Sequence, residues 1–565
     1  MKPRSYLFYF VIFAFTFFLF SIFAIRGVDP HHDGLMIKTS MDVLSGQTLY
    51  KDTFTQYGSL TTYIQVLFLY LFGAKLISLK LGTVAVYSAT AVMQFAIGRK
   101  YLPLALNIFL YFIWLIIAPF YRIDWAFLSW SSSFALFFQT ASTLCFLTAL
   151  SSKQSRIYCV LSGVFTAAVF WCRIPAGITF AAAYIIIFFS CLILIKNESF
   201  KGSAKVILIL KNYKHFLLGY FPVMIFFFGL LFFTESLGDW HYQVFEAPKM
   251  WLNNSFGTSP SRILWSLFYS PTSGIFITIS LFAILISVKF AEKKLPPSKL
   301  NLNLVYPLIL SSFIVLTFFI FSSISFDIFG GWASAIPIVL LGFFFVTCYG
   351  LFYRKSVTSE NQIILIWLSI IALSSWHQYF PVTCYRHIFW GVSPALGPFL
   401  MICLYIARFR VFPVIVSVGV FMLPMVADRI SVAKTNLTSS YVKVNSPTVL
   451  SGMLVNRSLF ETISTVNETI QNYLSSHPNT PILLDGGDAL YNTFSSNLSN
   501  PEPMFVSWGY SNKESIAKRE TFIKLQKPII IVQSRPEEKL QEYKTKFNYK
   551  VILSVDSMVI LVPTN

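Results

Sequence analysis

Residues 27–34 read Gly-Val-Asp-Pro-His-His-Asp-Gly, follow the first long apolar run of the chain, and open a polar loop that continues to Gly58. The loop gathers four carboxylates and the histidines His31 and His32 in an otherwise apolar chain. Charged groups are costly beside a bilayer, so a cluster of them at a membrane surface usually has a function. The function of the loop depends on which side of the membrane it occupies.

The composition predicts a membrane protein. Of the 565 residues, 55% are hydrophobic and only 12% are charged, whereas a soluble protein carries roughly a quarter charged residues. Apolar runs of spanning length predict about thirteen transmembrane helices. The expected spans cover about 6–25, 81–97, 103–120, 125–150, 157–173, 175–196, 215–233, 272–290, 303–323, 332–352, 362–376, 391–407 and 411–427.

The distribution of charge predicts the topology. Lys2 and Arg4 precede the first apolar run, which we interpret as a retained signal-anchor with the N-terminus inside. Together with Lys2 and Arg4, the loops then expected inside carry 19 basic residues, against 10 in the outside loops of the membrane part. Residues 59–73 are apolar but short, and we expect a helix at the membrane interface there, because a span would break the positive-inside rule.

The net charge of +19 is explained by this positive-inside pattern, and we expect no nucleic-acid partner. The seven cysteines form no Cys-x-x-Cys pair, which argues against a disulfide framework or a zinc site. Most acids and histidines of the membrane part fall on the outer face, including the loop 26–80. The expected location is the cytoplasmic membrane of a bacterium, with many spans.

Two domains are predicted. Residues 1–427 form the transmembrane part, with the first outer loop at 26–80, and residues 428–565 form a small extracytoplasmic α/β domain. Buried strands are expected at 481–485, 528–532 and 559–562, and helices at 452–476, 513–525 and 536–545.

Asp29 and Asp33 are the first candidate catalytic residues. Asp29-Pro30 is typical of a helix start, with Asp at the N-cap and Pro at the first helical position, and capping alone would explain Asp29. Asp33 then falls in the first turn, where the helix dipole favours the ionised form. An ionised carboxylate facing water can act as a general base, and the alternative is a solvated surface acid.

Two further groups of the loop have alternative interpretations. His31, His32 and Asp33 could belong to a divalent-metal site, although adjacent histidines point apart on a helix; no cofactor is otherwise indicated. Asp52 either assists Asp33 or pairs with Lys51.

Cations at the outer edges of the spans are candidates for binding a phosphate. Arg173 lies between two spans, Arg122 lies beside Asp124, and a third group holds Arg386 and His387. An arginine at headgroup level suits a phosphate group. The alternative is that these side chains snorkel to the interface.

The chain resembles the GT-C glycosyltransferases, integral membrane enzymes that use polyprenyl-phosphate-linked sugars and include protein O-mannosyltransferases and the lipid A aminoarabinose transferase. The resemblance rests on His32-Asp33-Gly34 just after the first span, a Gly-x-x-x-Tyr-x-Asp segment at 46–52, Tyr57-Gly58, and an apolar helix that ends at 71–73. Juxtamembrane helices, about thirteen spans and an outer C-terminal domain fit the same layout. Where the family usually has paired acids, this chain has His32 before Asp33.

The resemblance implies an inverting sugar transfer at the outer face. The donor would be a polyprenyl-phosphate-linked sugar, and the acceptor a hydroxyl of an envelope glycan, lipid or protein. Asp33 would be the general base, with Asp29 as its rival. Arg173, Arg386 or Lys51 would stabilise the leaving phosphate, and His32, Tyr57, Arg122, Asp124 and His387 would contact the substrates.

Two other classes of protein remain alternatives. A secondary transporter would place ionisable groups near the middle of the bilayer and often shows repeated halves, and neither feature is apparent in the sequence. A non-enzymatic sensor or structural protein would not require the acidic loop.

Overall fold

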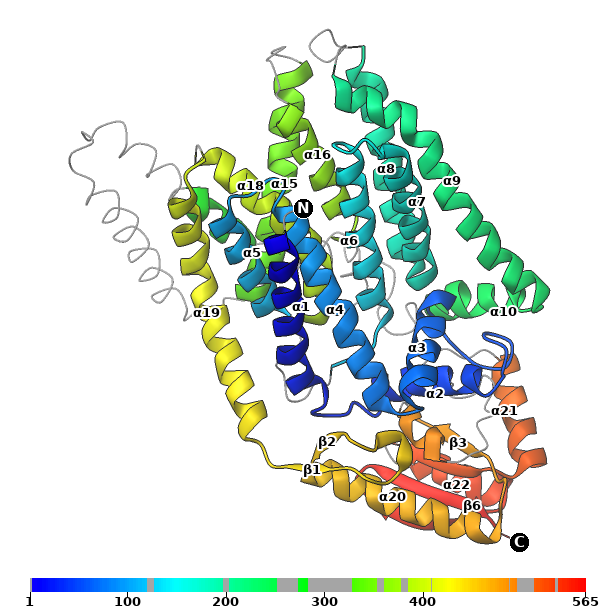
Figure 1. Cartoon of the computed structure of the whole chain (residues 1–565). Helices are drawn as coiled ribbons and strands as arrows, with labels where there is room; N and C mark the ends of the chain where they lie inside the picture. Colours follow the sequence, from blue (N-terminus) through cyan, green and yellow to red (C-terminus); the bar gives the residue numbers. More distant parts are fainter. Residues whose placement is uncertain are drawn as a thin grey trace.

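The computed structural model describes residues 3–118, 127–196, 203–250, 273–282, 328–352, 360–376, 385–407, 409–486, 488–494, 513–533 and 537–564. It consists of a bundle of long helices with a small sheet domain at one end (Figure 1). Helix α1 (Pro3–Ala24) runs from the N-terminus toward that end, so the start of the chain and the sheet domain lie at opposite ends of α1.

The bundle makes the chain a multi-pass membrane protein. Eight helices of the described residues are long and apolar enough to cross a membrane, or nine if the two halves of α19, which bend by 55°, form one span. Besides α1, the helices of the bundle are α4 (Leu76–Gly98), α5 (Leu104–Ile117), α6 (Ser131–Ala149), α7 (Ser155–Cys172), α8 (Ile174–Leu194), α9 (Ala204–Phe233), α15 (Ile328–Phe352), α16 (Glu360–Leu373), α17 (Tyr385–Val392), α18 (Leu396–Ile406) and α19 (Val411–Thr438).

The expected spans coincide with helices wherever the structure describes them. The run at 303–323 lies outside the described residues, and only the first part of the run at 272–290, Ser273–Phe282, is described. Helices α5, α16 and Ser273–Phe282 are shorter than a full span. The multi-pass architecture is therefore confirmed, whereas the count of about thirteen stays a prediction.

Two short helices form a layer between the bundle and the sheet domain (Figure 1). They are α2 (His32–Leu44) and α3 (Ser59–Phe72), and α3 is the apolar helix expected at the interface. One face of α3 buries polar groups such as Thr61 and Gln65, while Tyr70 and Phe72 are exposed. Exposed aromatic side chains on a 14-residue helix suit the headgroup region of a membrane. After α9, α10 (Leu237–His241) and the π-helix η3 (Tyr242–Glu246) lie beside this layer.

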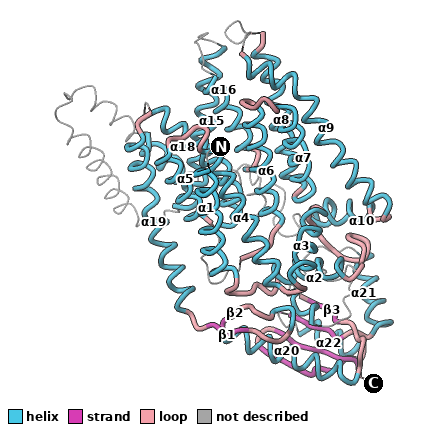
Figure 2. Tube along the Cα trace, in the orientation of Figure 1, coloured by secondary structure: helices cyan, strands magenta, loops and turns pink. Residues whose placement is uncertain are grey.

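The C-terminal domain is an α/β unit whose four-stranded sheet has the order β3-β4-β6-β5. Strands β3 (Ile482–Asp485) and β4 (Ile529–Gln533) are parallel, and β6 (Met558–Pro563) is antiparallel to both β4 and β5 (Tyr549–Val555). Figure 2 shows the strands gathered at this end of the molecule. The helices are α20 (Arg457–Ser476), α21 (Lys513–Gln526) and α22 (Glu537–Lys546), and a separate pair joins β1 (Tyr441–Lys443) to β2 (Leu454–Asn456).

These elements include the three strands and three helices expected from the sequence, and β1, β2 and β5 are additions. The helix expected at 452–476 begins only at Arg457, because Leu454–Asn456 form β2. Helix α19 runs on to Thr438, so the expected boundary at residue 428 falls within this helix.

The loop after α1 is joined to the C-terminal domain by backbone hydrogen bonds. Gly27 N–H donates to the Leu454 carbonyl (2.8 Å), and Leu454 N–H donates to the Ile25 carbonyl (2.8 Å). Leu490 N–H donates to the Pro30 carbonyl (3.1 Å). Apolar residues of both parts also share one hydrophobic core, which includes Val28, Met36, Leu76, Leu450, Val455 and Ile463. The loop after α1 therefore folds against the C-terminal domain as part of the same core.

Gly34 allows this close approach. A Cβ atom at residue 34 would lie 2.1 Å from the backbone nitrogen of Leu490, in the 3₁₀ helix η7 (Ala489–Phe494). Backbone atoms cannot move aside as a flexible side chain can, so only glycine fits at this position.

We predict that Gly34→Ala destabilises the protein by about 1–3 kcal/mol, because the added methyl group overpacks the contact between α2 and η7. Gly229→Ala is the matched control, because a Cβ there meets nothing within 4 Å in α9 and alanine favours a helix. The measurement is the unfolding midpoint of both variants in detergent. Equal midpoints for the two would contradict the close packing of α2 on the C-terminal domain.

Candidate functional site

Asp29 caps the turn that leads into α2. Its Oδ1 accepts the backbone N–H groups of His31 (3.1 Å) and His32 (2.9 Å). The capping role expected from the sequence is therefore present, although α2 itself begins at His32, two residues later than Pro30. The cap fixes where the following side chains lie.

Asp33 forms a buried ion pair with Lys80 of α4. The Lys80 Nζ lies 2.8 Å from the Asp33 Oδ2, and the two side chains are 0% and 1% exposed. The same Oδ2 accepts the Asp29 N–H (2.9 Å), and Lys80 also donates to the Gly27 carbonyl (3.2 Å). Burial raises the pKa of Asp33, and the Lys80 ammonium opposes this shift. Asp33 is therefore a buried group that joins α2 to α4.

His32 lies beside two carboxylates. Its Nδ1 is 2.7 Å from the Asp29 Oδ2, and its side chain is 32% exposed. Asp488, which follows β3 in the C-terminal domain, also lies near His32. Burial raises the pKa of Asp488, and the nearby Asp29 and His32 act on it in opposite directions. Gln533, at the end of β4, makes two hydrogen bonds to Asp488. The Gln533 Oε1 accepts the Asp488 backbone N–H, and the Gln533 Nε2 donates to the Asp488 carboxylate.

Trp130 is the centre of an aromatic cluster at the start of α6. Its ring centroid lies 5.1 Å from that of His32, 6.3 Å from Tyr57, 5.9 Å from His387 and 5.5 Å from Trp390. These side chains come from α2, the first outer loop, α6 and α17. Three residues that the sequence nominated as substrate contacts, His32, Tyr57 and His387, are therefore brought together around one tryptophan.

Tyr57-Gly58 packs against the turn between α7 and α8. A Cβ at Gly58 would lie 2.1 Å from the Trp171 carbonyl oxygen, and the Gly58 N–H donates to the Cys172 carbonyl (3.2 Å). Arg173 follows in that turn, half-buried. Burial raises the pKa of Tyr57, and the Arg173 guanidinium opposes this shift. The glycine thus allows the contact that sets Arg173 near Tyr57.

Lys51 and Asp52 have other partners. The Lys51 Nζ pairs with the Glu235 Oε2 at 2.8 Å on the surface, and both side chains are well exposed. Asp52 is exposed and accepts the Thr48 N–H (2.7 Å). The expected alternative, a pair between Lys51 and Asp52, is thus replaced by a pair between Lys51 and Glu235, and the structure gives Asp52 no contact with Asp33.

Three nominated residues are only partly visible or not visible at all. Arg122 and Asp124 lie outside the described residues, and Arg386 lies in α17 beside His387 with its side chain outside them.

The metal hypothesis for His31, His32 and Asp33 is not supported. Across the described ranges, no group of three or more His, Cys, Asp or Glu side chains could hold a metal ion.

Lys80, Trp130 and Asp488 belong to the site but were not nominated from the sequence. Lys80 is the only charged residue in the apolar run 76–98, and an isolated charge of this kind is a usable signal. Trp130 resembles any interfacial tryptophan. Asp488 is about 450 positions from the loop it approaches, and no local pattern in the sequence indicates that contact.

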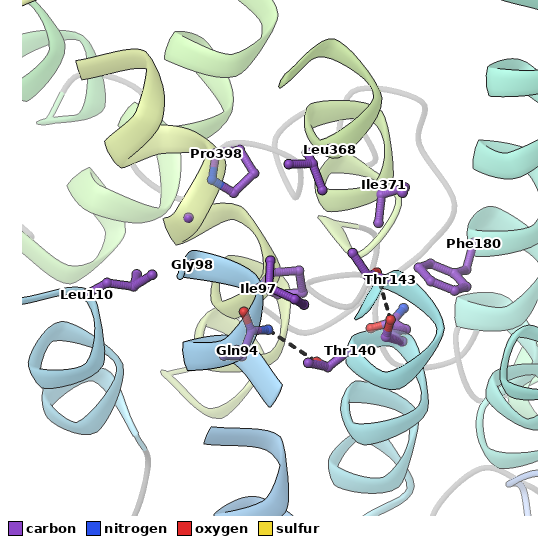
Figure 3. A pocket seen from close by; sticks show the side chains of 13 residues that line it. Gln94, Ile97, Gly98, Leu110, Thr140, Thr143, Phe180, Leu368, Ile371 and Pro398 are labelled. Carbon is purple, nitrogen blue, oxygen red and sulfur yellow. Dashed lines mark hydrogen bonds between the residues drawn. The ribbon is translucent and has the colours of Figure 1, made fainter. Parts of the chain in front are cut away.

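A separate pocket lies within the bundle between α4, α5, α6, α8, α16 and α18 (Figure 3). Its polar wall holds Gln94, which donates to Thr140 (3.2 Å), and Gln139, whose Oε1 accepts from Ser375 (3.3 Å). Thr143 is also polar, the remaining lining residues are apolar, and no lining residue is titratable. The candidate groups for proton transfer and anion binding therefore lie in the cluster around Trp130 and not in this pocket.

No protein-family model matches the chain, and no curated protein does. Similar solved structures include the oligosaccharyltransferase of Archaeoglobus fulgidus in complex with Zn and sulfate, at 12% identity over 93% of this chain and 68% of that chain, with a TM-score of 0.49. ArnT from Cupriavidus metallidurans is similar in the apo state (12% identity, 99% and 97% covered, TM-score 0.44) and bound to undecaprenyl phosphate (11%, 99% and 98%, 0.39). At these identities and TM-scores, the similarity concerns the fold alone.

We predict that Lys80→Met lowers the free energy of unfolding by about 3–5 kcal/mol, because it leaves the Asp33 carboxylate buried without its cation. The measurement is chemical or thermal unfolding in detergent. Lys51→Met is the control, because the exposed pair with Glu235 contributes little, and its midpoint should match the wild type. Adding Asp33→Asn to Lys80→Met should recover part of the loss, and no recovery would contradict a direct ion pair.

Proposed function

We propose that the chain is a GT-C-like glycosyltransferase. It transfers a sugar, with inversion, from a polyprenyl-phosphate-linked donor to an acceptor hydroxyl at the outer face of the membrane. The observation that carries the proposal is the cluster around Trp130, where His32, Tyr57 and His387 meet between the bundle and the C-terminal domain. Aromatic faces with polar groups at their edges suit a sugar ring.

The charges near the Trp130 cluster support a position for the donor. Arg173 lies near Tyr57, and the carboxylates Asp29 and Asp488 lie near His32. A phosphate is attracted by a guanidinium and repelled by carboxylates. In the proposal, the leaving phosphate therefore lies at Arg173, and the hydroxyl groups lie near the carboxylates.

The polyprenyl tail requires an apolar path next to Arg173. The turn that holds Arg173 joins α7 and α8, two of the candidate spans. A phosphate held at this turn lies at the end of the apolar bundle, which is where the headgroup of a lipid carrier belongs. The positive-inside pattern supports the outer face for this end.

The sequence predicted Asp33 as a general base that faces water, but its side chain is buried. A general base must reach the proton that it removes. The Asp33 side chain is 1% exposed and bonded to Lys80 and to the Asp29 backbone. To act as the base, Asp33 would have to leave this pair, so within the proposal its main effect is to fix the first turn of α2.

We predict that purified protein in proteoliposomes transfers radiolabelled sugar from a polyprenyl-phosphate-linked or polyprenyl-diphosphate-linked donor to an envelope extract. Arg173→Gln should lower kcat/KM for the donor by roughly 10- to 100-fold, because a charge-assisted hydrogen bond to the phosphate is lost. The assay follows labelled acceptor and released lipid phosphate.

Arg156→Gln is the matched control, because Arg156 is exposed at the other end of α7 and should leave transfer unchanged. If no donor of either kind supports transfer by the wild type, the glycosyltransferase proposal is wrong and a transporter or a sensor becomes the better interpretation. Equal activity of Arg173→Gln and the wild type would remove Arg173 from the site.

A further inference from the structure

The imidazole of His32 is held on one side only. Its Nδ1 lies 2.7 Å from the Asp29 Oδ2, and a carboxylate only accepts hydrogen bonds, so the ring proton belongs on Nδ1. Among the described residues, no hydrogen bond is made by Nε2. This nitrogen therefore carries a lone pair in a side chain that is 32% exposed.

From this geometry, and resting on the proposed function, we infer that His32 is the general base of the transfer, with Asp29 as the residue that orients it. A histidine whose Nδ1–H is fixed by a carboxylate presents Nε2 as a proton acceptor in one defined direction. That nitrogen belongs to a ring that lies 5.1 Å from the ring of Trp130, the residue at which the substrates would meet.

The other acids of the loop are less suited to this role. Asp29 already accepts the N–H groups of His31 and His32 with one oxygen and faces the His32 ring with the other. Asp33 is fully buried in its pair with Lys80. Of these three side chains, His32 is the most exposed and keeps an acceptor that no described residue occupies.

Several side chains surround the His32 ring. Asp29 faces it from the preceding turn, with its Oδ2 2.7 Å from the His32 Nδ1. The ring of Trp130 lies 5.1 Å from the His32 ring and 5.9 Å from the His387 ring, and His31 packs edge-on at 4.6 Å. The Asp29 carboxylate is therefore the group placed to orient His32 during the transfer.

The proposed step requires only the donor, the acceptor and water. The His32 Nε2 takes the proton of the acceptor hydroxyl as the acceptor oxygen forms its bond to the anomeric carbon. The bond from that carbon to the phosphate oxygen breaks, and the lipid phosphate leaves with the electron pair toward Arg173. The imidazolium then returns its proton to water.

The test compares His32→Ala, His32→Gln, Asp29→Asn and Arg156→Gln in the proteoliposome assay. His32→Gln should lower kcat by about 10²- to 10⁴-fold, the usual contribution of a general base, while KM for the donor changes little. Asp29→Asn keeps a capping oxygen but loses the carboxylate, so a smaller loss in kcat is expected. Arg156→Gln is the control and should stay near the wild type, because Arg156 is exposed at the other end of α7.

Chemical rescue separates catalysis from folding. Imidazole added to His32→Ala that unfolds at the wild-type midpoint should restore kcat by at least roughly tenfold, because free imidazole can replace the missing base. Wild-type activity in His32→Gln, or loss without rescue in His32→Ala, would overturn the inference. These outcomes presuppose transfer by the wild type, so they are distinct from failure of the proposed function, in which the wild type itself is inactive.

Discussion

The ion pair between Asp33 and Lys80 is the interaction on which the end of the bundle next to the C-terminal domain depends. Both side chains are essentially inaccessible, so each charge would be strongly unfavourable without the other. Lys80 also binds the Gly27 carbonyl, and Asp33 also accepts the Asp29 N–H. One buried pair thereby fixes the connection from α1 into α2 against α4. Its value lies in defining a single position for α2, since a buried pair by itself is weak evidence of high stability.

The position of α2 determines what the site can contain. With its first turn fixed, Asp29 caps that turn and orients His32 toward Trp130, and Gly34 lets the backbone of η7 approach. The C-terminal domain then lies close enough for Asp488 to come near His32. The close contact of Gly58 with the α7–α8 turn brings Arg173 near Tyr57. Carboxylates and a guanidinium thus lie near one aromatic cluster, the arrangement expected when a hydroxyl attacks a sugar phosphate.

Much of this fold follows from local sequence patterns. Apolar length predicted the spans, the alternation of apolar runs and turn residues predicted β3, β4 and β6, and Asp29-Pro30 predicted the cap. The partners of charged residues were harder to predict. The sequence around Asp33 is the same whether its side chain faces water or Lys80. The burial of Asp33 depends on α4, which holds Lys80 almost fifty residues further along the chain. Lys51 likewise pairs with Glu235, far along the chain. Asp488 lies in the site only because the two domains share a hydrophobic core. No periodic pattern in the sequence predicts that contact.

In the proposed function, the loop after α1 and the C-terminal domain form one unit, with the site between them. Hydrogen exchange of the full-length protein in detergent tests this arrangement at the amides of Gly27, Leu454 and Leu490, which bond across the junction. These amides should exchange as slowly as the amides within α20, in one cooperative opening. Fast exchange at these three amides beside a protected α20 would show that the domain moves independently of the loop, and would contradict a site built from both.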